Sequence, residues 1–81
     1  MKKIIDIRSK SKYDISHIPG AINIDSLDLL NNPSRYLNMN DTYYIYCTSG
    51  YTSDAVVHKL NRLGYNTVNI DGGFNNYLLR K

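Results

Sequence analysis

The stretch from residue 43 to residue 63 constrains the fold of this chain more than any other. It opens with Tyr43-Tyr44-Ile45-Tyr46, an aromatic and β-branched run that is typical of a buried strand. The single cysteine, Cys47, follows directly, and a short polar loop with one glycine comes after it. Apolar residues then recur with the spacing of one helical face, at Val56, Leu60 and Leu63. This order predicts a strand, a loop carrying the cysteine, and a helix that Gly64 terminates.

A cysteine in such a loop has surroundings that favour its thiolate. When a loop curls from a strand end into a helix, successive backbone N–H groups point inward, and the helix dipole adds positive partial charge. Both effects stabilise a thiolate and lower the pKa of the thiol. We therefore expect Cys47 to be a nucleophile in a cradle of backbone amides from the next six residues, Thr48, Ser49, Gly50, Tyr51, Thr52 and Ser53.

The alternative for Cys47 is ordinary core packing, because lone cysteines are often buried and inert. The loop favours the first interpretation, since small and polar residues are poor core material but let backbone approach a ligand closely. Thr52 or Ser53 is expected to cap the following helix, with Asp54 in its first turn. Tyr51 is a candidate for the rim of a pocket.

Length and cysteine content point to one domain in a reducing compartment. Eighty-one residues with 42% apolar side chains suit a single globular domain, residues 1–81. One cysteine allows no disulfide within the chain, so we expect a cytoplasmic protein. The N-terminal residues show no apolar signal segment, and no window approaches the ~18 apolar residues of a membrane span.

The charge balance favours a small anionic ligand over a nucleic acid. The formal net charge is +3, from ten Lys and Arg against seven Asp and Glu. A mild excess of this kind usually means a solvated basic face, which attracts small anions and is too weak a signal for nucleic-acid binding. A metal site is not expected, because only His17 and His58 could join Cys47 as ligands.

The rest of the chain alternates between short strands and helices. Further strands are expected at residues 3–7, 21–24 and 66–70, and helices or helical turns at residues 9–16, 26–30, 33–37 and 74–79. This alternation indicates an α/β fold with a short parallel sheet joined by right-handed crossovers. Ligands of such sheets bind beyond the carboxyl ends of the strands, which is where Cys47 falls.

Four motif blocks along the chain resemble the single-domain rhodanese family. They are Ile5-Asp6-Ile7-Arg8, His17-Ile18-Pro19-Gly20-Ala21-Ile22-Asn23, the loop from Cys47 to Ser53, and Gly72-Gly73-Phe74. One block alone would be weak, but four in this order over nearly the whole chain are specific. The resemblance implies a three-layer rhodanese-like α/β fold with about four parallel strands flanked by helices. It also implies a sulfurtransferase of the thiosulfate:cyanide type, with a persulfide carried on Cys47.

The implied reaction uses small partners and no cofactor. The Cys47 thiolate would take the outer sulfur of a donor such as thiosulfate or a persulfide, and a thiol or cyanide would then accept it. Three further residues of the motif blocks are expected to support the site. Asp6 and Arg8 would form an ion pair or bond to nearby loops, and His17 would hold the Pro19-Gly20 turn.

Two other functions compete with sulfur transfer for this sequence. Phosphatases of the same fold carry an arginine six residues after the cysteine, but Ser53 stands at that position here. Without a guanidinium, phosphoryl transfer lacks its main charge stabiliser, which argues against a phosphatase. A binding module or persulfide carrier with little thiosulfate activity stays open, because the loop after Cys47 contains no basic residue.

The chain also departs from the family at its N-terminal side. Family members usually carry a strand and a helix before the Asp-x-Arg strand, and here only residues 1–3 precede it. We therefore expect a sheet trimmed to four strands, with the strand at 66–70 exposed along one edge. Such an edge invites pairing with another chain, so a monomer or a weak dimer is expected.

Overall fold

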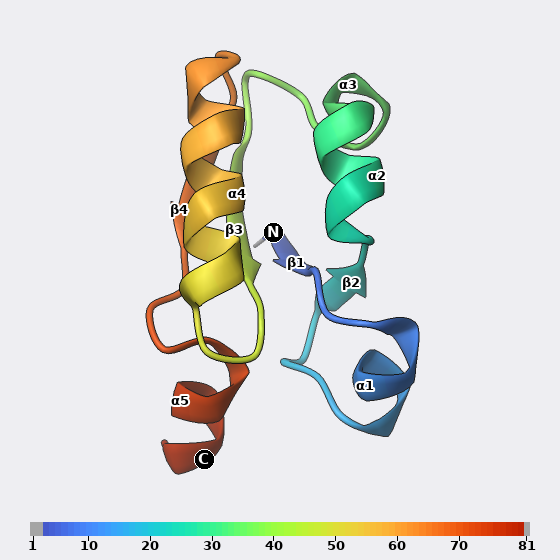
Figure 1. Cartoon of the computed structure of the whole chain (residues 1–81), viewed down its shortest axis with the longest axis vertical. Coiled ribbons are helices and arrows are strands. Elements are labelled where there is room, and N and C mark those ends of the chain that lie inside the picture. Colours follow the sequence, from blue (N-terminus) through green and yellow to red (C-terminus); the bar gives the residue numbers. More distant parts are fainter. Residues whose placement is uncertain (1–2, 81) are drawn as a thin grey trace.

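The computed structural model describes residues 3–80, in which short parallel strands alternate with helices (Figure 1). The sheet has four strands in the order β2-β1-β3-β4, and every neighbouring pair is parallel, as the sequence predicts. The elements in chain order are β1 (Ile4–Asp6), α1 (Lys10–Ile15), β2 (Ala21–Asn23), α2 (Ser26–Asn31), α3 (Pro33–Tyr36), β3 (Thr42–Tyr46), α4 (Tyr51–Arg62), β4 (Asn66–Asn69) and α5 (Gly73–Leu79).

Helices on both faces of the sheet give the molecule three layers. On one face, buried residues of α2 and α4 such as Leu29 and Leu60 pack against Ile5 and Ile45 of the central strands. On the other face, Phe74 of α5 forms a smaller cluster, against which Tyr13 of α1 packs. Residues of alternating strand positions therefore enter two different cores, which a parallel sheet with both faces covered requires.

Strand register brings two of the motif blocks to the same end of the sheet. Asp6 of β1 lies opposite Tyr46 of β3, and the Ile7 N–H donates to the Tyr46 carbonyl at 3.0 Å. The segments that follow these two strands, Arg8 and Cys47, therefore leave the sheet side by side at its carboxyl end. Ligands of parallel sheets bind at this carboxyl end of the strands.

The structure corrects the predicted start of the helix after Cys47. This helix, α4, begins at Tyr51 after Gly50, which has a φ of 94° and caps it without a side-chain hydrogen bond. Neither Thr52 nor Ser53 is the cap, because the left-handed glycine turns the chain early enough for both to lie within the first helical turn. The Ser53 side chain is consequently fully buried and available to the site.

The predicted apolar face of this helix is right for Val56 and Leu60 and wrong for Leu63. The helix ends at Arg62, and Gly64 then turns the chain with a φ of 102°, which leaves Leu63 55% exposed. Val57 is the third side chain of this helix in the same core cluster. Gly64 terminates the helix as expected, and the other boundaries differ from the predicted ones by a residue or so.

Within residues 3–80, no helix combines the length and the hydropathy that crossing a membrane requires.

Candidate functional site

Cys47 lies immediately beyond the carboxyl end of β3, at the base of a pocket. Its side chain is 7% exposed and is reached through a pocket of about 400 Å³. The pocket is lined by residues from the β1–α1 segment and from the Cys47 loop, namely Ile7, Arg8, Ser9, Lys12, Cys47, Thr48, Ser49 and Thr52. The thiol is thus largely shielded from solvent and still borders a space that a small molecule can enter.

Backbone amides converge on the Cys47 sulfur. The Gly50 N–H donates to Sγ at 3.2 Å and the Ser53 N–H at 3.3 Å, and the Ser49 amide also contacts the sulfur. Amides arranged in this way solvate an anion without paying for reorganisation, as an oxyanion hole does. They would stabilise a thiolate and equally the terminal sulfur of a persulfide anion.

The first turn of α5 fixes the orientation of this loop. The Phe74 N–H donates to the Cys47 carbonyl at 2.9 Å, and the Asn75 N–H donates to the Thr48 carbonyl at 3.0 Å. Both loop carbonyls are therefore held on the α5 side. The approach is close at Gly73, where an added Cβ would lie 2.4 Å from the Cys47 carbonyl oxygen. Glycine is required there by space as well as by its φ of 58°.

The surroundings lower the pKa of the Cys47 thiol. Burial alone raises this pKa, but the neighbouring Ser53 hydroxyl and the backbone amides of Ser53, Gly50 and Ser49 outweigh it. Ser53 is itself placed by Asn69, at the carboxyl end of β4. The Ser53 hydroxyl donates to Asn69 Oδ1 at 2.5 Å, and Asn69 Nδ2 donates to the Gly50 carbonyl at 3.2 Å.

The predicted cradle residues have different positions in the structure. Ser49, Gly50 and Ser53 direct amides at the sulfur, whereas Thr48 and Thr52 line the pocket. Tyr51 does neither, so its predicted place at the pocket rim is wrong. Its side chain is 86% exposed and its N–H donates to Ser49 Oγ at 3.4 Å, because the first residue of α4 faces away from the sheet.

Asp6 and Arg8 form the expected ion pair beneath the pocket. The Arg8 guanidinium donates to both Asp6 carboxylate oxygens and to the Ser16 carbonyl, and Tyr46 donates to Asp6 Oδ2 at 2.7 Å. Burial and the bond to Asp6 raise the pKa of the Tyr46 phenol, which therefore stays protonated. The guanidinium also lies 4.0 Å from the Phe74 ring centroid. This network joins β1, β3 and α5 around the site and gives Arg8 a structural role.

His17 lies outside the pocket that contains Cys47. Its Nδ1 pairs with the Tyr13 carbonyl at 2.7 Å, and its ring stacks on the Tyr13 ring with the centroids 3.7 Å apart. The residue thus supports α1 more directly than the Pro19-Gly20 turn. His58 is on the surface of α4, and residues 3–80 contain no cluster of three or more potential metal ligands.

Sequence reasoning missed Ser9 and Lys12, which enter the pocket from the β1–α1 segment. The sequence could indicate their position only indirectly, through the order of the strands. The segment after β1 must leave the sheet beside the segment after β3 if these strands are neighbours, but strand order cannot be read from spacing alone.

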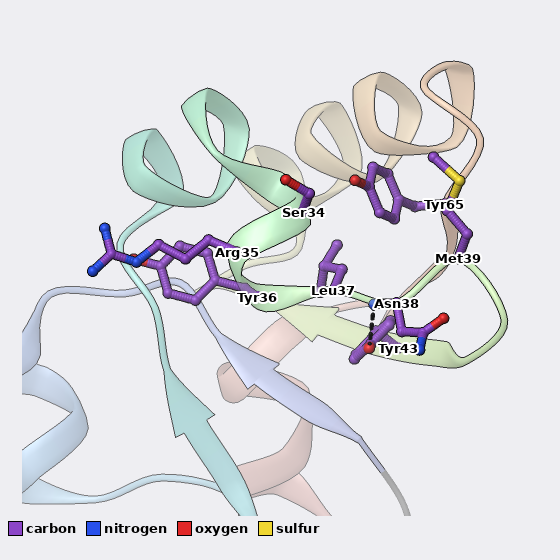
Figure 2. A pocket seen from close by; sticks show the side chains of 8 residues that line it. All are labelled: Ser34, Arg35, Tyr36, Leu37, Asn38, Met39, Tyr43 and Tyr65. Carbon is purple, nitrogen blue, oxygen red and sulfur yellow. Dashed lines mark hydrogen bonds between the residues drawn. The ribbon is translucent and has the colours of Figure 1, made fainter.

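A larger pocket, of about 540 Å³, lies elsewhere between α3 and β3 (Figure 2). The Asn38 N–H donates to the Tyr43 hydroxyl at 2.7 Å inside it. Its eight lining residues include no cysteine, histidine or carboxylate, so it lacks a thiol nucleophile and the usual groups of a general base. The chemistry of the described residues is concentrated at Cys47.

Comparisons with known proteins bear on the family of this chain. The family model for the rhodanese-like domain matches residues 1–80. The thiosulfate sulfurtransferase PspE of Escherichia coli is 31% identical over 78 residues, which cover 95% of this chain and 75% of PspE. YrkF of Bacillus subtilis, named for a proposed role as a sulfur carrier, is 34% identical over 65 residues, covering 80% of this chain and 35% of YrkF.

A solved structure shows the same fold. The crystal structure of SSP1007 from Staphylococcus saprophyticus superposes with a TM-score of 0.87 at 37% identity, covering 94% of this chain and 75% of that one. The chain thus spans about a third of YrkF and three quarters of PspE and SSP1007.

Proposed function

This chain belongs to the rhodanese-like domain family, and from that premise we propose that it transfers sulfur through a persulfide on Cys47. The donor is a small anion with a transferable outer sulfur, such as thiosulfate, and the acceptor is a thiol or cyanide. The observation that carries this proposal is the set of amides from Ser49, Gly50 and Ser53 directed at the cysteine sulfur.

Both half-reactions are displacements at one sulfur atom. The Cys47 thiolate attacks the outer sulfur of thiosulfate, the S–S bond of the donor breaks, and sulfite leaves with the bonding electron pair. Cyanide then attacks the terminal sulfur of the persulfide, and thiocyanate departs as the thiolate re-forms. No proton moves in either step, so the absence of a general base near Cys47 in the described residues does not impede the reaction.

The amides serve the reaction throughout the cycle. They stabilise the thiolate before attack and the persulfide anion after it, and they are already oriented before substrate arrives. Cys47 must be in its reduced, free form for this cycle to begin, which suits a reducing compartment such as the cytoplasm.

Mass spectrometry of the intact protein tests this proposal directly. After incubation with thiosulfate and removal of excess reagent, the wild type is expected to gain the mass of one sulfur atom, and cyanide is expected to remove it. Cys47→Ser is the matched control, because it keeps the size and polarity of the side chain and loses the nucleophile. Equal uptake by Cys47→Ser, or no uptake from thiosulfate or any persulfide donor, would refute the proposal.

A persulfide carrier is the second candidate, and the similarity to YrkF favours it. A carrier would take up one sulfur on Cys47 and hold it until a partner protein accepts it. Steady-state production of thiocyanate separates the two functions, since a carrier loads once and turns over slowly with cyanide, whereas an enzyme produces thiocyanate continuously.

A further inference from the structure

The pocket around Cys47 is cationic even though the loop after Cys47 contains no basic residue. Two of its eight lining residues are basic, Arg8 and Lys12, and none is acidic. The remaining polar liners are hydroxyl residues, Ser9, Thr48, Ser49 and Thr52, which can donate hydrogen bonds to an anion. Charge and donors together make this pocket complementary to a small oxyanion.

The two cations differ in their availability. The Arg8 side chain is 6% exposed, and its guanidinium is already bound to Asp6 and to the Ser16 carbonyl. Lys12 is on the exposed side of α1, and within residues 3–80 its ammonium makes no ion pair. Lys10, on the same helix, is paired instead with Asp14 at 2.7 Å. Lys12 is therefore the pocket cation that a ligand can engage.

We propose that Lys12 determines donor specificity by binding the anionic group of the sulfur donor while its outer sulfur meets Cys47. This inference rests on the proposed function of Cys47. It adds to that function the residue that would bind the sulfonate group of a donor such as thiosulfate. Lys12 supplies the charge contact from a helix distant in sequence, and the hydroxyl residues of the loop complete the oxyanion site.

The arrangement also favours the departure of sulfite. Sulfite leaves as a dianion at the side of the pocket away from Cys47, and a flexible ammonium stabilises it there without holding a fixed geometry. The chemistry around the sulfur thus depends on amides, and recognition of the leaving group depends on Lys12.

Steady-state kinetics with thiosulfate test the proposal within the reaction. Lys12→Gln is expected to raise the KM for thiosulfate about fivefold, the size of effect typical of one partly exposed charge contact. Lys10→Gln is the matched control, because it removes the same charge from the same helix outside the pocket. Thr52→Arg places a guanidinium at the pocket wall and is expected to restore a low KM in the Lys12→Gln background.

A second measurement keeps Lys12 testable whether or not thiosulfate is a substrate. Iodoacetate and iodoacetamide alkylate Cys47 by the same displacement, but only iodoacetate is anionic. The ratio of their rates therefore reports the cation in the pocket. Lys12→Gln is expected to lower this ratio severalfold and Lys10→Gln to leave it almost unchanged.

The outcomes separate the two claims. An unchanged ratio and an unchanged KM in Lys12→Gln, or equal effects of the two lysine variants, would overturn the role of Lys12. If the protein takes up no sulfur from any donor and the ratio still falls, the proposed function fails and the cationic pocket stands.

Discussion

At the residue scale, Ser53 connects the cysteine to the rest of the sheet. Its hydroxyl has one proton and two acceptors within reach, the Cys47 sulfur and Asn69 Oδ1. Its backbone N–H also donates to the sulfur, and that bond depends on helix geometry rather than on the side chain. Replacing the side chain therefore isolates what the hydroxyl contributes to the thiolate.

Ser53→Ala is expected to raise the pKa of Cys47 above its wild-type value. The wild-type pKa is lowered from the ordinary value of a thiol, and the Ser53 hydroxyl makes the largest of the contributions that lower it. A hydrogen bond to a charged group contributes about 1.5 kcal/mol, so alkylation by iodoacetamide at neutral pH should slow about tenfold. The pH dependence of that rate measures the shift, with its midpoint moving to higher pH.

Ser49→Ala provides the comparison for this prediction, because Ser49 contributes its backbone amide to the sulfur and that amide survives the substitution. An identical midpoint in Ser53→Ala and wild type would contradict the assignment.

The lowered pKa of Cys47 also has a consequence for the stability of the fold. The pKa of Cys47 is lower in the folded protein than in the unfolded chain. The thiolate therefore stabilises the fold at pH values above the unfolded pKa, and this contribution disappears as the pH falls through the folded pKa.

Residues close together in sequence could be predicted at this scale, and residues joined only by the fold could not. The amide cradle follows from the local order of strand, loop and helix, so the positions of Gly50 and Ser53 beside Cys47 could be predicted from the sequence. Asn69 and Lys12 contact the site from β4 and α1, and their positions depend on strand order. Tyr51 was misplaced for a local reason, because the early helix start turned its side chain outward.

At the element scale, α5 acts as a support for the Cys47 loop. Its first N–H groups hold the Cys47 and Thr48 carbonyls, and the two segments are nearest at Gly73. A helix of seven residues can do this because Phe74 anchors it in the smaller core cluster. The Gly72-Gly73-Phe74 block was visible in the sequence, but its contact with the loop was not.

Gly73→Ala is expected to disrupt the loop and to destabilise the fold. The new methyl group would clash with the Cys47 and Thr48 carbonyl oxygens, and relief of such overpacking costs about 1–3 kcal/mol. Gly20→Ala is the matched control, since Gly20 has a φ of 88° and nothing within 4 Å of an added Cβ. Both variants place an alanine in the left-handed region, which costs free energy in each, but only Gly73→Ala also introduces a clash.

Urea unfolding and Cys47 alkylation measure the two effects of this change. Gly73→Ala should unfold at lower urea than Gly20→Ala and should also react more slowly with iodoacetamide at neutral pH, because displaced amides no longer stabilise the thiolate. Equal stability and equal reactivity of the two variants would show that α5 does not position the loop.

At the scale of the whole molecule, the sheet formed by the described residues ends on one side at β4, the strand that the family resemblance predicts at an edge. The sequence did not show how this edge is protected. Thr67 of β4 directs its N–H and carbonyl away from β3, and the Asn61 side chain of α4 binds both. Thr67 N–H donates to Asn61 Oδ1 at 2.9 Å, and Asn61 Nδ2 donates to the Thr67 carbonyl at 3.1 Å. One amide thus occupies two of the groups that a neighbouring strand would pair.

This amide leads us to favour the monomer over the edge-paired dimer. Asn61→Ala is expected to leave both Thr67 groups without a protein partner, which lowers stability by about 1 kcal/mol and opens the edge to strand addition. Light scattering over a range of concentrations should show a monomeric wild type and a growing dimer fraction in the variant. Asn66→Ala is the control, because it removes an amide from the same strand that bonds only to the Met39 carbonyl. A wild type that is already dimeric would contradict the protection of this edge. Faster exchange of the Thr67 amide hydrogen in Asn66→Ala than in Asn61→Ala would show that Asn61 is not the group that protects it.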